Sequence, residues 1–313
     1  MKTARFQIAA KIETVQGTPE VLAAGDVIRA ANPVFSPGVE MHDLQDGNGS
    51  LSPTPQMAGG TTGTITFDVW LRGSGAAGTP PEWGKLLKAC GMVEDVDAGA
   101  GVNYLPSDDD TEHESLTIGY YVDGKLYQIA GCMGNAVISL VAGKPCKIAF
   151  TFTGVAWTVT DVAILTGVNT QDTLPPIFKD GLVDIDGEDG CIETITVNLN
   201  NSVQLRPCAN AASGYSASYL GSRRFTMSLD PEAVLAAAKD WYADWTAGTT
   251  FAFTATLGAT AGNKIIFTAP ACQLTNVNPA DKAGMLIEPM ECLLCGSSGG
   301  DEFKITFDTD AGE

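Results

Sequence analysis

Alternation of polar and apolar residues marks Gly63 to Leu71 as a half-buried β-strand. The next apolar residues recur at helical spacing within Pro80 to Cys90, where Thr79 is a candidate N-cap and Gly91 a stop signal. The pattern predicts a strand followed by a short amphipathic helix, whose buried face holds Trp83, Leu86, Leu87 and Cys90.

The same order returns later in the chain. Arg223 to Leu229 predicts a strand, and Asp230 to Trp241 predicts a helix that Asp230 caps and Pro231 opens. The expected buried face of this helix consists of Val234, Leu235, Ala238 and Trp241.

A hairpin is expected after each helix. In the first copy Asp123-Gly124 separates two alternating runs, which is a strong hairpin signal, and in the second copy a Gly-containing turn separates residues 250–257 from 264–272. Each copy then closes with a penultimate segment (135–140 or 288–294) and a last strand (147–153 or 303–308).

An extended stretch rich in Gly, Ser, Asn and Pro precedes each helix, Asp46 to Thr62 in the first copy and Asn198 to Ser222 in the second. Loops of this length are uncommon unless they serve as interaction arms. Their apolar residues could contact other molecules or cover their own domain. These candidates are Leu44, Leu51, Met57, Leu205, Tyr215 and Tyr219.

The repeated order predicts a mainly β protein with two tandem β-sandwich domains, each with one short flanking helix and a long extended loop. The expected domains are residues 1–165 and 177–313, joined by a linker at 166–176. Alternatively, two generic β-domains share this order by chance.

Charge and composition exclude several classes of function. The formal net charge of -19 argues against gripping nucleic acid, because such binding needs Lys and Arg to replace phosphate counterions. The first residues lack the apolar run of a signal peptide, and no segment is long enough to span a bilayer. The eight cysteines are scattered, so we expect reduced and mostly buried thiols in a protein made in a cytoplasm.

Candidate catalytic and metal-binding chemistry is weak. The two histidines are His42 and His113, and the acidic run at 108–114 is interpreted as a solvated loop rather than a cation site. Residues 184–190 fail the spacing of a calcium loop, and Cys292 and Cys295 have no second pair or histidine at zinc-ligand spacing. We therefore expect no catalytic residues, metal or cofactor.

The chain resembles the tail tube (major tail) proteins of long-tailed phages. The segment from Gln7 to Glu20, in which Glu13 precedes Gly17-Thr18 by a short spacer, is similar to the start of many such proteins. The strand, helix and hairpin order carries the rest of the resemblance, which covers nearly the whole chain.

The resemblance implies a structural virion protein of a non-contractile (siphophage) tail. Six domains of this family form a ring, so a duplicated tube domain implies homotrimeric rings with pseudo-sixfold symmetry, stacked into a tube through which DNA passes without sequence-specific binding. The implied partners are other copies and further tail proteins (tape measure, tail terminator and distal tail). The protein would be assembled in the host cytoplasm and reside in the virion tail, with no membrane contact.

Two other classes are weaker alternatives. A two-domain β-sandwich adhesin or carbohydrate-binding module would need an exposed aromatic platform, but Trp70, Trp83, Trp157, Trp241 and Trp245 mostly fall on predicted core faces. An enzyme is the weakest, because no set of residues converges.

Overall fold

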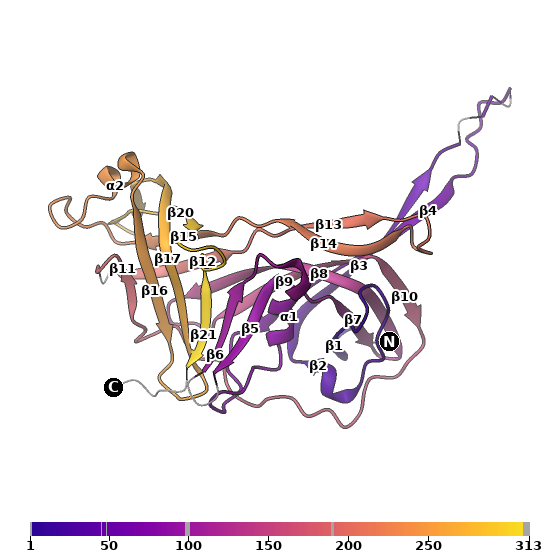
Figure 1. Cartoon of the computed structure of the whole chain (residues 1–313), viewed down its shortest axis with the longest axis horizontal. Coiled ribbons are helices and arrows are strands. Elements are labelled where there is room, and N and C mark those ends of the chain that lie inside the picture. Colours follow the sequence, from indigo (N-terminus) through magenta and orange to yellow (C-terminus); the bar gives the residue numbers. More distant parts are fainter. Residues whose placement is uncertain (1, 45, 48, 98–100, 189–190, 309–313) are drawn as a thin grey trace.

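A computed structural model describes residues 2–44, 46–47, 49–97, 101–188 and 191–308, which are built mainly from antiparallel strands (Figure 1). This confirms the predicted mainly β class. In chain order the elements are β1 (Phe6–Ile12), η1 (Ala24–Asp26), β2 (Val27–Ile28), β3 (Ala30–His42), β4 (Met57–Trp70), α1 (Gly84–Lys88), β5 (Met92–Asp97), β6 (Gly101–Pro106), η2 (Asp110–Glu112), β7 (Leu116–Val122), β8 (Lys125–Val141), β9 (Lys147–Gly154), β10 (Ala156–Thr160), β11 (Val183–Ile185), β12 (Ile192–Asn198), β13 (Ser202–Pro207), β14 (Tyr215–Ser222), β15 (Thr226–Pro231), α2 (Trp241–Ala247), β16 (Thr250–Leu257), β17 (Lys264–Val277), β18 (Ala280–Lys282), β19 (Met285–Ile287), β20 (Met290–Cys295) and β21 (Lys304–Asp308).

One sheet, called here the long sheet, runs through the first half (1–165) and the second half (177–313) of the chain. Its strand order is β3–β4–β9–β8–β12–β15–β20–β17, and every neighbouring pair is antiparallel. The halves meet where β12 pairs with the C-terminal part of β8, from Thr194 opposite Val141 to Asn198 opposite Val137.

Two shorter outer sheets share strands with the long sheet, because β8 and β17 are long enough to bend from one sheet into the next. The N-terminal part of β8 lies between β7 and β10, and β7 continues to β1 and β2. The N-terminal part of β17 lies between β16 and β21. There β16 pairs with β11, whereas β21 pairs with β6 of the β5–β6 hairpin. A hairpin of the first half therefore completes the outer sheet of the second.

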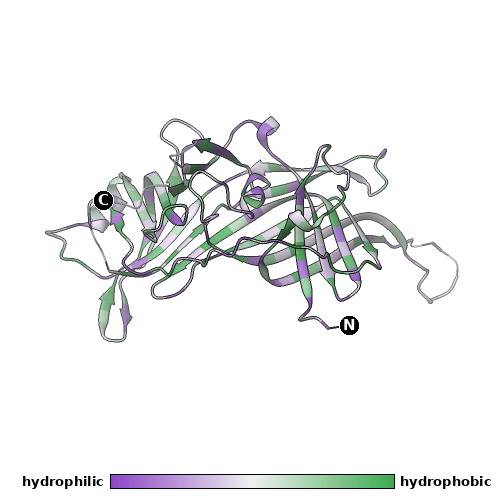
Figure 2. Ribbon diagram, turned by 90° about the horizontal axis from the view of Figure 1, so that it is seen from below, coloured by the Kyte–Doolittle hydropathy of each residue, from purple (hydrophilic) through white to green (hydrophobic). Residues whose placement is uncertain are grey.

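The core follows from the alternation along the strands, which is visible as alternating colours in Figure 2. In β9 the side chains of Ile148, Phe150 and Phe152 are buried, and Thr151 between them is exposed. Buried residues of both halves, including Phe67 and Phe253, belong to one hydrophobic cluster. Removing such side chains from water contributes about 1.5–3 kcal/mol each, which drives both halves to pack together.

Helix α1 is shorter than predicted. It starts at Gly84 after a turn, and its N-cap position is Trp83 rather than Thr79. The four residues of its predicted core face are buried, and Gly91 has a left-handed φ of 78° that ends the segment as expected.

The second predicted helix was misplaced. Asp230 and Pro231 are the last residues of β15, and the Asp230 carboxylate accepts hydrogen bonds from the backbone N–H groups of Glu193 and Thr194 at 3.1 and 2.6 Å. These two N–H groups lie at the bulge in β12, and the Asp230 carboxylate is their acceptor there, so Asp230 does not cap a helix. The helix is α2, which Asp240 caps by accepting from the Ala243 N–H at 2.9 Å.

Both predicted hairpins are present as β7–β8 and β16–β17, the first with Asp123 and Gly124 at positive φ in its turn. Two other expectations need correction. Residues 135–140 continue β8 and do not form a separate segment. The extended stretches also contain strand, since β4 begins at Met57 and the second stretch folds into the β13–β14 hairpin.

The strands that close each half also differ from the expected correspondence. β9 lies between β4 and β8 in the long sheet, and the strand in the matching place of the second half is β20, between β15 and β17. β21, expected to match β9, instead pairs with the outer part of β17, as β10 pairs with the outer part of β8, and β6 lies on its other side.

The predicted linker 166–176 holds no helix or strand and follows the surface of the first half. Gln171 exchanges hydrogen bonds with Glu82, whose carboxylate also contacts the buried Arg72 guanidinium at 3.2 Å. Burial lowers the pKa of Arg72, and the facing Glu82 carboxylate partly offsets this effect. The division into two domains at this linker stays a prediction.

Candidate assembly surfaces

The face of the long sheet that points away from the core carries hydroxyl and amide side chains. Thr66, Thr151 and Asn135 stand side by side across β4, β9 and β8. Beyond the junction of the halves the row Ser139, Thr196 and Ser228 crosses β8, β12 and β15. We call this surface the polar face.

The polar face is continuous across the junction between the halves. The Asn135 side chain donates to Oδ1 of Asn198 at 2.8 Å, from β8 to β12. Charges on this face include Asp68, which pairs with Lys147 at 3.0 Å, and the exposed Glu291. Such a surface presents neutral hydrogen-bonding groups together with some negative charge.

The two ends of the long sheet carry strand edges that no described strand covers. β3 pairs with β4 alone, and residues 274–277 of β17 pair with β20 alone. Unpaired backbone N–H and C=O groups along an edge are a template for pairing with another chain. Pro33 and Pro37 in β3 fit this position, since proline is tolerated on edge strands.

The β13–β14 hairpin of the second half lies across the first half (Figure 1). The Tyr215 hydroxyl donates to Glu40 at 2.7 Å, and the Thr61 N–H donates to the Ser213 carbonyl at 2.9 Å. Ser218 is buried and donates to the carbonyl of Gly131 at the bend of β8. Part of the predicted second arm thus covers its own chain.

The hairpin formed by β3, β4 and their connecting loop projects away from the body (Figure 1). We call the described residues between 36 and 62, that is 36–44, 46–47 and 49–62, the β3–β4 arm. Three predicted contact residues lie on it with exposed side chains: Leu44 is 44%, Leu51 106% and Met57 57% exposed. On the β13–β14 hairpin Leu205 and Tyr215 are half-buried, and Tyr219 is 49% exposed. Their contact with other copies stays a prediction.

A buried carboxylate ties the N-terminal segment to this region. Oε1 of Glu13 accepts from the Thr117 hydroxyl at 2.8 Å and the Gly131 N–H at 2.7 Å. Oε2 accepts from the Ser115 hydroxyl at 2.6 Å and the Gly17 N–H at 2.7 Å. Glu13 had no predicted role, although its spacing to Gly17 gave a signal, because the chain must turn back at Gly17 for the bond from the Gly17 N–H to form.

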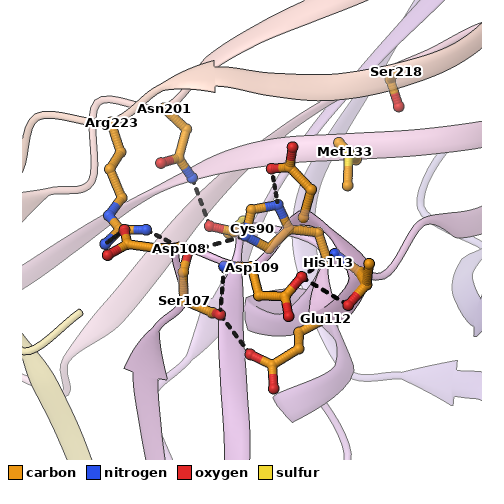
Figure 3. Close-up of polar contacts among 12 residues, drawn as sticks. Cys90, Ser107, Asp108, Asp109, Glu112, His113, Met133, Asn201, Ser218 and Arg223 are labelled. Carbon is orange, nitrogen blue, oxygen red and sulfur yellow. Dashed lines mark hydrogen bonds and ion pairs between the residues drawn. The ribbon is translucent and has the colours of Figure 1, made fainter. Parts of the chain in front are cut away.

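The acidic run at 108–114 joins the two halves (Figure 3). Asp108 pairs with Arg223 at 2.6 Å, and Arg223 also contacts Glu302 at 2.5 Å. The His113 ring is largely buried, and its Nε2 lies 3.1 Å from the Ser107 carbonyl oxygen. The run is therefore only partly the solvated loop that was expected.

The remaining candidate chemistry is accounted for by local structure. Asp184 accepts from the Gly187 N–H at 2.8 Å in a turn, and residues 189–190 of this predicted turn lie outside the described residues. Cys292 lies in β20, where burial raises the pKa of its thiol to about 12. Within the described ranges, no group of His, Cys, Asp and Glu side chains could hold a metal ion, and no helix could cross a membrane.

The tryptophans do not form an aromatic platform. Trp83 and Trp241 are buried as expected, and Trp157 is half-buried with its N–H donating to the Gly38 carbonyl at 3.2 Å. Trp70 and Trp245 are 41% and 38% exposed, and they lie on β4 and on α2 in different halves of the chain.

The architecture defines the class of a mainly β structural protein with open strand edges, projecting hairpins and an extended polar face. The chain matches the family model described as phage tail tube protein over residues 3–292, and it belongs to this family. It is therefore a structural component of the virion tail and not an enzyme. A search of curated proteins gives no match.

Proposed function

We propose that copies of this protein polymerise into stacked rings that form the tail tube, the conduit through which phage DNA passes. The observation that carries this proposal is the β8–β12 pairing, which continues one sheet from the first half into the second and leaves edges open at β3 and at residues 274–277 of β17. Pairing of these edges between neighbouring copies would extend the same sheet into a closed ring.

The two halves support a ring of three copies with pseudo-sixfold symmetry. In each half the chain order is a strand of the long sheet, then a helix, then a hairpin of the outer sheet whose second strand bends into the long sheet. These elements are β4, α1 and β7–β8 in one half and β15, α2 and β16–β17 in the other. This parallel order favours a duplicated tube domain. The β8–β12 pairing is then an internal example of the contact between copies.

The polar face would line the lumen. Thr, Ser and Asn side chains exchange hydrogen bonds with water readily, and the exposed Glu291 repels phosphate, so DNA would slide without specific binding. We further infer that the tail is of the non-contractile type and that the tube assembles in the host cytoplasm, with a tape measure, a tail terminator and a distal tail protein as partners.

Electron microscopy of the purified protein tests this proposal. We expect rings or tubes, end-on class averages with six similar densities, and oligomer masses that are multiples of three copies in native mass spectrometry. A species that remains monomeric at concentrations of about 1 mM would overturn the proposal.

A further inference from the structure

An apolar surface on the second half is left open to solvent. We call it the α2 patch, and its members are exposed by 38–81%: Val234, Leu235, Tyr242, Trp245, Met285 and Leu286. The Ala233 N–H donates to the Leu286 carbonyl at 3.0 Å, which brings the segment of Val234 and Leu235 beside β19, and the Tyr242 hydroxyl of α2 lies near Glu288, which follows β19. Clustered apolar side chains of this size are typical of interaction sites.

The helix in the corresponding place of the first half has no such open surface. Trp83, Leu86 and Leu87 at α1 are fully buried. Gly91, just after α1, is covered by the β13–β14 hairpin, since a Cβ at Gly91 would stand 2.5 Å from Cδ1 of Leu220. The hairpin therefore passes directly over the C-terminal end of α1.

The end of α2 offers a similar position that is uncovered. Gly248 follows α2 with a left-handed φ of 66°, as Gly91 follows α1 with 78°. A Cβ at Gly248 would meet only Nε2 of Gln273, at 3.4 Å. The second half thus has a place like the one that β13–β14 fills in the first half.

The β3–β4 arm is the element that matches this place. Along the chain it precedes α1 as the β13–β14 hairpin precedes α2. It exposes Val39 and Met41 in addition to Leu44, Leu51 and Met57. The arm projects from one end of the molecule and α2 lies at the other (Figure 1). Its own chain therefore cannot bring the two together.

We propose that the β3–β4 arm of one copy lies across the second half of the neighbouring copy in the ring, past Gly248, and covers the α2 patch. This rests on the proposed ring assembly and names the surface that receives the arm. The contact is heterologous, so it can repeat from copy to copy until the ring closes. Both surfaces carry acidic residues, including Asp43 on the arm and Asp240 at α2, so apolar burial drives the contact.

Complementary variants test this contact. The arm variant combines Leu44→Gln with Met57→Gln, and the patch variant combines Tyr242→Gln with Trp245→Gln. All four side chains are exposed, so folding should be preserved, which urea unfolding of the monomers checks. A control variant combines Leu174→Gln with Val159→Gln, which are exposed elsewhere.

Sedimentation velocity and negative-stain images give the readout. We expect each variant alone to need at least about tenfold more protein than wild type to assemble, and the control to match wild type. An equimolar mixture of arm and patch variants should give a 1:1 dimer, because it contains one intact arm and patch per pair.

The proposal is overturned if the arm variant and the patch variant both assemble at the same protein concentration as wild type. It is also overturned if neither variant assembles alone and their mixture yields no dimer. Absence of rings for wild type would instead refute the proposed function. A second patch variant, Met285→Gln with Leu286→Gln, lies on β19 and must reproduce the defect, which guards against a local effect on α2.

Discussion

At the scale of the residue, Glu13 is the buried charge on which the N-terminal segment depends. It is 7% exposed, and its carboxylate accepts from two hydroxyl groups and two backbone N–H groups. We expect Glu13→Ala to lower the free energy of unfolding by about 3–5 kcal/mol, because it leaves several buried donors without acceptors.

Urea denaturation of the two proteins measures this loss. Glu13→Gln should also destabilise, because the amide offers one acceptor oxygen and turns an NH₂ toward existing donors. Glu291→Ala is the matched control on the exposed polar face and should change stability by less than about 0.5 kcal/mol. Equal effects at the two positions would contradict the role assigned to Glu13.

Glu20 gives the N-terminal segment a pH dependence. Hydrogen bonds from Lys11 and Thr14 lower the pKa of its carboxyl from 4.5 to about 2 in the folded protein. The unfolded state therefore binds the proton more readily, and the stabilisation is complete above about pH 5 and is lost as the pH falls toward 2.

The difference in unfolding free energy between wild type and Glu20→Gln should accordingly be larger at pH 6 than at pH 3, as denaturant titrations at both values would show. Asp184→Gln is a comparison at an acidic turn residue far from Lys11. A difference that grows as the pH falls would show that the sign is wrong.

At the scale of the element, the bend of β8 explains how one strand serves two sheets. Gly131 has a left-handed φ of 66°, and a Cβ there would meet Cγ2 of Val155 at 2.7 Å and Cα of Gly17 at 3.3 Å. We expect Gly131→Ala to destabilise the protein by about 2–4 kcal/mol, from backbone strain and from this steric conflict together.

Gly143→Ala separates the two causes. Gly143 has a similar φ of 72°, but nothing lies within 4 Å of its Cβ position. It should cost only the strain, about 1–2 kcal/mol in urea unfolding. If both variants lose the same stability, close packing at the bend contributes nothing.

Hairpins were predictable from the sequence because their signals are local: Asp123-Gly124 and the alternation around it specify β7–β8 without reference to the rest of the chain. The second helix was misplaced because Asp230-Pro231 has the local form of a helix start, whereas its carboxylate binds N–H groups of β12, nearly 40 residues away. No local pattern reveals that partner.

The same limit applies to the surfaces. Leu44, Leu51 and Met57 could be named as contact candidates because they are apolar residues in flexible, polar surroundings, but whether they cover their own domain could not be predicted; their side chains are exposed. Leu235 was assigned to the buried face of the second predicted helix but is 81% exposed, because helical spacing shows which side chains would share a face but not whether another element covers that face.

At the scale of the whole molecule, the net charge of -19 opposes assembly, because joining copies brings like charges together. Salt shortens the screening length from about 30 Å at 0.01 M to about 8 Å at 0.15 M. We therefore expect the protein concentration at which polymer appears, followed by light scattering, to fall as NaCl is raised over this range.

KCl at equal ionic strength should act alike if screening is the cause. A threshold that rises with salt would indicate that ion pairs between copies dominate the contact.

The pairing of β6 with β21 links strands separated by some 200 residues, Tyr104 lying opposite Ile305. During translation β5–β6 leaves the ribosome early and must wait, with one border unpaired, until β21 emerges. The outer sheet of the second half can therefore be completed only after β21 has been synthesised. A product that ends before β21 would leave this edge of β6 without its partner strand, so we expect it to be more open to proteolysis than the full chain.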